Sequence, residues 1–148
     1  MLQYEKVQKG CDCMLSALVC DNSPLLRKEI SLLLQDKGFT EILEASDGPE
    51  ALRVFNTHRV DLVVMDIILP KQDGISVLKE VMEIQRNLPV IMTSSCSQGS
   101  HLRRTRFLGA AAYIQKPITA GKMTEALDAA ALAQLEPEVH ASSTAGGK

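Results

Sequence analysis

The sequence predicts an α/β domain with a five-stranded, doubly wound parallel sheet. Five short apolar runs recur along the chain, and segments with helical spacing of apolar residues separate them. The starts of neighbouring runs lie 18 or more residues apart. This spacing accommodates the crossover that a parallel connection requires, and the alternation is typical of helices packed on both faces of a sheet.

The apolar runs have the length of strands and are continuously apolar, as expected for strands covered on both faces. They span Leu15–Cys20, Glu41–Ala45, Asp61–Met65, Pro89–Ser94 and Ala111–Ile114. The flavodoxin-like strand order 2-1-3-4-5 is the leading choice for five such units, although periodicity alone does not prove the order.

Each run is followed by a segment with helix signals. The first predicted helix begins at Ser23-Pro24, an N-cap followed by proline at the first helical position, and ends at Gly38. The apolar stripes of the four clearest helices are Leu25, Leu26, Ile30, Leu33 and Leu34; Ala51, Leu52 and Phe55; Ile75, Leu78, Val81 and Met82 after Asp73-Gly74; and Met123, Leu127 and Ala130 after Thr119. The fourth helix, within residues 98–108, has few strongly apolar residues, namely Leu102, Phe107 and Leu108. We therefore expect it to form but to be held loosely.

The chain of 148 residues has room for one domain of ordinary size. With 45% hydrophobic and 23% charged residues, its composition is globular. We place the domain at residues 14–134, between an N-terminal tail (1–13) and a flexible C-terminal tail (135–148) that is rich in small residues.

The charge and the segment lengths exclude several classes. A formal net charge of -2 gives no overall field that would attract nucleic acid or an anionic membrane. No apolar stretch approaches the roughly 20 residues that span a bilayer, and we see no secretory signal at the N-terminus. The four cysteines match neither a disulfide framework nor a paired zinc motif. We expect a cytoplasmic protein with reduced thiols.

Polar residues end four of the predicted strands, at the edge where open α/β sheets bind ligands. The first strand ends in Asp21-Asn22, the third in Asp66 and the fourth in Ser94-Ser95, while the fifth leads into Lys116-Pro117. Two carboxylates can hold a divalent cation such as Mg²⁺, and Lys and Ser can contact phosphoryl oxygens. Asp66 could itself accept a phosphoryl group. Singly, such residues are more often helix caps or solvated charges, but four matching strand ends favour the functional interpretation.

These motifs resemble the receiver domain of two-component response regulators, the CheY-like family, over about residues 14–134. The resemblance rests on Cys20-Asp21-Asn22-Ser23-Pro24-Leu25-Leu26-Arg27, on Asp61-Leu62-Val63-Val64-Met65-Asp66-Ile67-Ile68-Leu69-Pro70 with Asp73-Gly74, on Pro89-Val90-Ile91-Met92-Thr93-Ser94, and on Ala112-Tyr113-Ile114-Gln115-Lys116-Pro117. It implies a CheY-like (βα)5 fold. It also implies a phosphoacceptor that assists its own phosphotransfer and is not a turnover enzyme.

The resemblance implies a role for each residue of the motifs. Asp66 resembles the phosphoacceptor that receives phosphate from a histidine kinase, and Ser94 the switch hydroxyl. Lys116 resembles the cation that contacts the phosphoryl group, and Tyr113 the aromatic switch. The Mg²⁺ ligands implied are Asp21, Asp66, the backbone carbonyl of Ile68 and, in weakened form, Asn22. The family also implies a cis peptide bond between Lys116 and Pro117.

Asn22 departs from the family pattern, which has two adjacent acids after the first strand. An amide offers a carbonyl oxygen but no charge, so the affinity for Mg²⁺ should fall. An alternative alignment makes Asp21 the direct ligand and puts Cys20 at the outer acid position. In either alignment one carboxylate is missing.

The leading hypothesis is a phosphorylation-controlled switch that signals through its fourth helix, fifth strand and fifth helix. Its expected partners are a sensor histidine kinase or phosphotransfer protein and a downstream protein target, with no nucleic acid or membrane, and it is expected to be a monomer or weak dimer. The alternative is a receiver that no longer depends on phosphorylation and binds its partner constitutively, which Asn22 favours. The basic run 101–106 is a second candidate contact, for a partner with an acidic face. Two other functions are disfavoured. A phosphohydrolase of the haloacid-dehalogenase type would need a second acid at the position that Ile68 occupies. A flavodoxin-type cofactor role would need a phosphate-binding loop after the first strand, and the sequence has none there.

Overall fold

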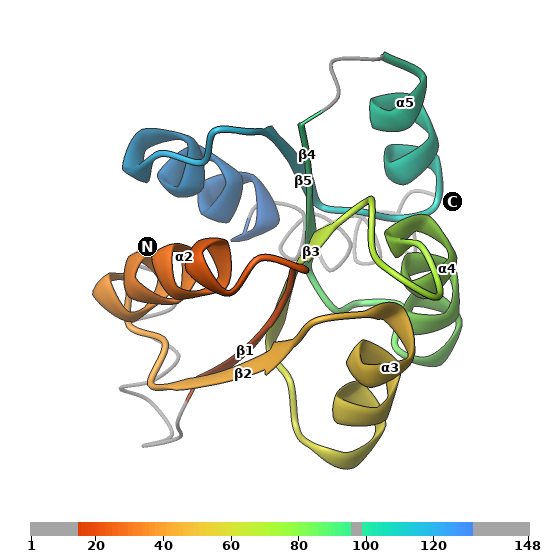
Figure 1. Cartoon of the computed structure of the whole chain (residues 1–148). Helices are drawn as coiled ribbons and strands as arrows, with labels where there is room; N and C mark the ends of the chain where they lie inside the picture. Colours follow the sequence, from red (N-terminus) through yellow and green to blue (C-terminus); the bar gives the residue numbers. More distant parts are fainter. Residues whose placement is uncertain (1–14, 96–98, 132–148) are drawn as a thin grey trace, which may run out of the picture.

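The computed structural model describes residues 15–95 and 99–131. They contain a five-stranded sheet in the order β2-β1-β3-β4-β5, and all neighbouring strands are parallel (Figure 1). The predicted class and strand order are confirmed. The strands are β1 (Ser16–Cys20), β2 (Glu41–Ala45), β3 (Leu62–Asp66), β4 (Val90–Ser94) and β5 (Ala112–Gln115).

Helices cover both faces of this sheet. They are α2 (Pro24–Asp36), α3 (Gly48–Thr57), α4 (Gly74–Ile84), α5 (Gly99–Phe107) and a further helix at 120–131, here called the last helix. In Figure 1, α2 and the last helix lie on one side of the sheet, while α3, α4 and α5 lie on the other.

The core is divided by the sheet into two apolar clusters. Alternate residues of each central strand point to opposite faces, so that Leu18 and Val63 enter one cluster while Ala17 and Val64 enter the other. The first cluster is closed by α3 and α4, and the second by α2 and the last helix. Continuous apolar strands are therefore explained by burial on both faces, as the sequence predicts.

The ends of α2 follow the predicted signals. The Ser23 hydroxyl accepts a hydrogen bond from the Leu26 amide at 3.2 Å, and Pro24 occupies the first turn. Gly38 follows the helix with a φ of 106°, a conformation that glycine adopts readily. The prediction was wrong for Leu25, which is 67% exposed because the buried side of the helix is set by Ile30 and Leu34.

The two helices α4 and α5 differ in how they are anchored. Helix α4 buries Val77, Leu78 and Val81, whereas Ile75 and Met82, predicted to be buried, are only half-buried. Helix α5 is present as predicted, but Thr105 is the one residue of Gly99–Phe107 that is buried. This sparse anchoring agrees with the few apolar residues in its sequence.

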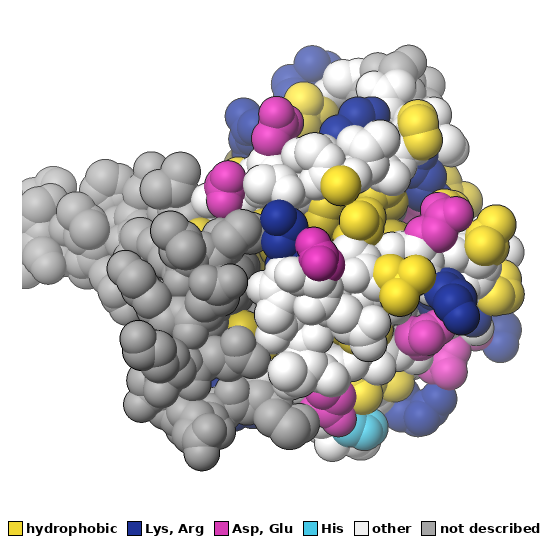
Figure 2. All heavy atoms as spheres, turned by 90° about the vertical axis from the view of Figure 1, so that its left-hand side faces the viewer, with side chains coloured by type: hydrophobic (Ala, Val, Ile, Leu, Met, Phe, Trp, Pro, Cys, Tyr) yellow, Lys and Arg dark blue, Asp and Glu magenta, His cyan; other side chains and the backbone are white. Residues whose placement is uncertain are grey.

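The predicted tails, 1–13 and 135–148, and the ends of the predicted domain lie outside the described residues. No helix among the described residues has the length and apolar character needed to cross a membrane. Figure 2 shows acidic and basic side chains interspersed on one face of the molecule, the side that lies at the left in Figure 1. This mixture agrees with the small net charge of the chain.

Candidate functional site

The carboxyl ends of β1, β3 and β5 bring three charged side chains together. The Nζ atom of Lys116 lies 2.9 Å from Oδ2 of Asp21 and 2.8 Å from Oδ2 of Asp66. Both carboxylates are nearly inaccessible, with 2% and 7% of the two residues exposed. Three of the four strand ends that the sequence singled out therefore meet in one cluster, because the ends of parallel strands share an edge.

The second oxygen of each carboxylate is held by the backbone. The Ser23 amide donates to Oδ1 of Asp21 at 2.8 Å, and the Ile68 amide donates to Oδ1 of Asp66 at 3.1 Å. Both acids are therefore fixed in orientation before any ligand binds, which is the preorganisation that a site for charge stabilisation requires.

Lys116 reaches this edge from the residue that follows β5. Its amide donates to the Ser94 carbonyl at 2.7 Å, so that the fifth strand stays joined to β4 at this point. The peptide bond between Lys116 and Pro117 is cis, which confirms the expectation drawn from the family resemblance.

The charges of the cluster are unequal, since one ammonium serves two carboxylates. Burial raises the pKa of Asp66, although the hydrogen bonds from Lys116 and from the Ile68 amide act in the opposite direction. Burial acts to lower the pKa of Lys116, but its hydrogen bonds to both acids outweigh this, and the pKa is raised. Lys116 therefore remains charged. Asp66 shares this single ammonium with Asp21, so the positive charge beside the two carboxylates does not balance both of them.

Ser94 and Tyr113 lie on the neighbouring strands β4 and β5, with Ser94 at the carboxyl end of β4 and Tyr113 level with the middle of that strand. Ser94 ends β4, is fully buried and pairs with Gln115 of β5. Tyr113 lies in β5 opposite Met92 and is half-buried against the first core cluster. It also lines a small cavity beneath α5 together with Leu102 and Thr105.

A family model described as the response regulator receiver domain matches residues 17–128. The chain belongs to this family. Receiver domains are components of two-component systems and act as signalling domains, not as turnover enzymes.

Two known proteins are similar to this chain over about three quarters of its length. It is 35% identical to the chemotaxis protein CheY of Bacillus subtilis over 111 residues, which cover 75% of this chain and 92% of that protein. The transcriptional regulatory protein PdtaR of Mycobacterium tuberculosis is 32% identical over 113 residues, but the match covers 76% of this chain and 55% of the relative. The chain thus spans about half the length of that relative.

Solved structures support the same assignment. The chain superimposes with a TM-score of 0.73 on a chain of the CheX-CheY-BeF3-Mg²⁺ complex from Borrelia burgdorferi, with 31% identity, covering 76% of this chain and 86% of that chain. A receiver domain protein from Clostridium thermocellum gives a TM-score of 0.72 at 28% identity and covers 85% of this chain and 98% of that chain.

The candidate ligands of this receiver are of the oxygen type that Mg²⁺ prefers, but they carry one negative charge fewer than the family pattern. Asp21 and Asp66 supply carboxylate oxygens, the ligand type that Mg²⁺ prefers, while Asn22 is exposed and carries no charge. Among the described residues, no group of three His, Cys, Asp or Glu side chains is placed to hold a metal. Family receivers generally bind Mg²⁺, and the residues here fit it with one carboxylate fewer.

Cys20 lies in the apolar cluster beside β3 and not at the edge. It is 1% exposed and opposite Met65, and burial raises the pKa of its thiol. A neutral, buried thiol is a poor ligand for a hard cation, which disfavours the alternative alignment.

Two residues that support the site received no role from the sequence. Arg27 donates through Nη1 to the backbone carbonyl of Asp21 at 2.6 Å and through Nε to Glu44 at 2.7 Å, and so fixes the chain at Asp21. Gly74 begins α4 so close to Asp66 that a Cβ atom there would collide with the Asp66 carbonyl oxygen. In the sequence, Asp73-Gly74 marked only the start of the predicted helix, and the close approach to Asp66 depends on the tertiary fold.

Proposed function

We propose that this receiver is a phosphorylation-controlled switch with Asp66 as the phosphoacceptor. The observation that carries the proposal is the position of Asp66: a buried carboxylate at the end of β3, hydrogen-bonded to Lys116 Nζ at 2.8 Å and beside Asp21. The partners we propose are a histidine kinase or phosphotransfer protein as the donor and a downstream protein as the target, with the cytoplasm as the location.

In the proposed reaction, a carboxylate oxygen of Asp66 attacks the phosphorus atom of a phosphohistidine. The new O–P bond gives an aspartyl phosphate as the P–N bond breaks, and the imidazole leaves with the electron pair and takes up a proton. Lys116 stays protonated and offsets the negative charge of the phosphoryl oxygens. Bound Mg²⁺, held by Asp21, Asp66 and the Ile68 carbonyl, would supply further positive charge.

The output of the switch is proposed to lie on the face formed by α5, β5 and the last helix. A groove of about 360 Å3 crosses this face and is lined by Tyr113 of β5, Arg106 of α5 and Lys122 of the last helix. The hydroxyl of Ser94 would bind a phosphoryl oxygen on Asp66. Tyr113 lines both this groove and the cavity beneath α5, and its side chain would change position when the Ser94 hydroxyl moves to the phosphoryl group.

Asn22 favours a second candidate, a receiver that binds its partner through the same face without phosphorylation. Both candidates predict a folded domain with this groove, and they differ in whether Asp66 is modified.

The test is incubation with acetyl phosphate and Mg²⁺, followed by intact mass and a Phos-tag gel. Wild type is expected to gain one phosphoryl group, Asp66→Asn none, and Asn22→Asp the same group at a lower Mg²⁺ concentration. If only Asn22→Asp is modified, the second candidate is the better account.

A further inference from the structure

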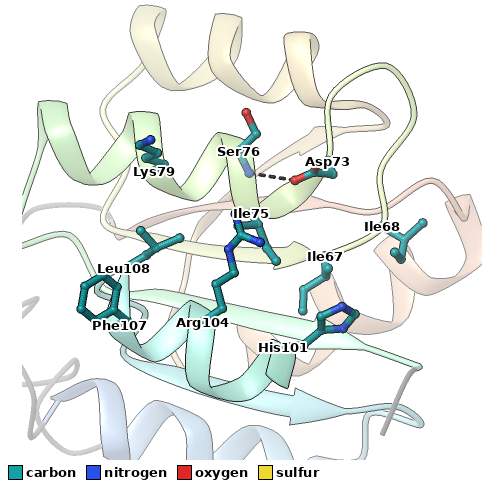
Figure 3. Close-up of a pocket in the computed structure, with 10 residues that line it drawn as sticks. All are labelled: Ile67, Ile68, Asp73, Ile75, Ser76, Lys79, His101, Arg104, Phe107 and Leu108. Carbon is teal, nitrogen blue, oxygen red and sulfur yellow. Dashed lines mark hydrogen bonds between the residues drawn. The ribbon is translucent and has the colours of Figure 1, made fainter. Parts of the chain in front are cut away.

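A second groove lies between α4 and α5, on the side of α5 away from the β5 face (Figure 3). Its volume is about 570 Å3. It is lined by residues from both helices and from the chain after β3: Ile67, Ile68, Asp73, Ile75, Ser76, Lys79, His101, Arg104, Phe107 and Leu108. None of these residues takes part in the charged cluster through its side chain.

Apolar side chains form the floor and both ends of this groove. Ile67, Ile75 and Leu108 lie along it, and the two ends are formed by Ile68 and Phe107 (Figure 3). Ile68 is 62% exposed and Phe107 is 88% exposed. Large apolar side chains with this exposure, at both ends of one groove, mark a surface that gains stability when it is covered.

The two helical walls add two permanent cations, Lys79 and Arg104, and one imidazole, His101, to this apolar surface. Lys79 projects from α4, while His101 and Arg104 project from α5. Within residues 15–95 and 99–131, Lys79 and Arg104 form no ion pair, and Nδ1 of His101 is buried without a hydrogen-bond partner.

The acid that lines the groove does not balance these cations. Asp73 caps α4, with its Oδ1 accepting a hydrogen bond from the Ser76 amide at 2.8 Å. One acid therefore faces two permanent cations and an imidazole, and the groove offers positive charge to an incoming group.

We propose that this groove binds an acidic segment of a partner protein, with apolar residues that cover Ile68 and Phe107 and carboxylates that pair with Arg104 and Lys79. A continuous segment is favoured because the exposed apolar residues lie at opposite ends, where one small ligand in the centre would leave them in water. Charge complementarity determines the acidic character of the partner. The site is separate from the β5 face, and its occupation requires no phosphoryl group.

The test begins with a random library of 12-residue displayed peptides selected on the full, unphosphorylated chain. Peptides that combine at least two acids with apolar residues are expected to be enriched. Affinity for one enriched, fluorescein-labelled peptide is then measured with wild type and with three variants: Arg104→Glu, Lys79→Glu and the matched control Arg103→Glu. Arg103 is an exposed cation on the same helix that does not line the groove.

Charge reversal at Arg104 or Lys79 is expected to weaken binding by about 10-fold or more, and reversal at Arg103 by less than about 3-fold. Amide shifts in NMR spectra of wild type should include Ile67 and Leu108. Three results would overturn the proposal. They are enrichment of peptides that lack acidic residues, an equal loss of affinity in all three variants, and amide shifts confined to β5. The proposal would also be overturned if a 12-nucleotide single strand displaced the peptides and lost its binding in Arg104→Glu. That result would assign the cations of the groove to nucleic-acid binding. Because no phosphorylation is involved, failure of the Asp66 reaction leaves this test intact.

Discussion

Strand β3 passes through two contrasting environments within five residues. Leu62, Val63, Val64 and Met65 are at most 1% exposed and contact apolar side chains on both faces of the sheet. Asp66, the next residue, is nearly as inaccessible but carries a carboxylate whose pKa is raised by burial. The apolar interior of the sheet stabilises the fold. Burial of the charged Asp66 at the carboxyl edge costs stability, and an apolar residue at that position would avoid the cost. Natural proteins retain such costly groups mainly at functional sites.

The carboxyl edge is itself not uniform. Asp47 and Asp73 also lie at this edge, but each caps a helix, accepting hydrogen bonds at 2.8 Å from the amides of Glu50 and Ser76. Caps stabilise helices because they satisfy amides that have no partner within the helix. The comparison therefore predicts three classes of substitution, whose effects on the free energy of unfolding differ in sign and size.

The largest effect is expected in the interior. Leu78 is fully buried in the first core cluster, and Leu78→Ala should lower the free energy of unfolding by about 2 to 5 kcal/mol through lost contacts and a cavity. The matched control on the same helix is Ile84→Ala, because Ile84 is 61% exposed, and its cost should be below about 1 kcal/mol. Urea denaturation measures both, and equal losses would contradict the assignment of the core.

A smaller loss is expected when a capping acid at the edge is removed. Asp73→Ala should destabilise the domain by about 1 kcal/mol, since the Ser76 amide loses its acceptor. Asp73→Asn keeps an acceptor oxygen and should retain most of the stability. If the Asn variant loses as much as the Ala variant in urea denaturation, the carboxylate acts through its charge and not as a cap.

The sequence predicted the site better than the ends of the elements that build it. Asp66 ends one parallel strand, and Asp21 and Lys116 directly follow two others, which alone implies a common edge. The start of β3 was misplaced by one residue, because Asp61 was counted within it. Asp61 lies before the strand, where its Oδ2 accepts a hydrogen bond from the Ser16 amide at 2.9 Å. Such a contact between distant segments leaves no trace in the local pattern.

The groove between α4 and α5 could not be predicted for a related reason. Helical periodicity assigns a buried side to each helix separately, but the space between two helices depends on how they pack. Phe107 illustrates this, since it counted as one of the few apolar residues of its helix and is 88% exposed. The sequence located the basic run but did not distinguish Arg104, which lines the groove, from Arg103, which does not.

The smallest effect, of opposite sign, is expected at Asp66. Because the pKa of Asp66 is raised in the folded protein, the unfolded chain releases this proton first as the pH rises from 4, and ionisation favours unfolding until the raised pKa is passed. Asn carries no such proton, and Asp21 remains as a partner of Lys116. Asp66→Asn should therefore raise the urea midpoint relative to wild type, by an amount that grows as the pH rises from 4 and levels off once the raised pKa is passed. The exposed Asp36→Asn is the matched control, expected to change stability by less than about 0.5 kcal/mol at every pH. A gain for Asp66→Asn that is the same at pH 3.5 and pH 7 would show that its cause is not the burial of a charge.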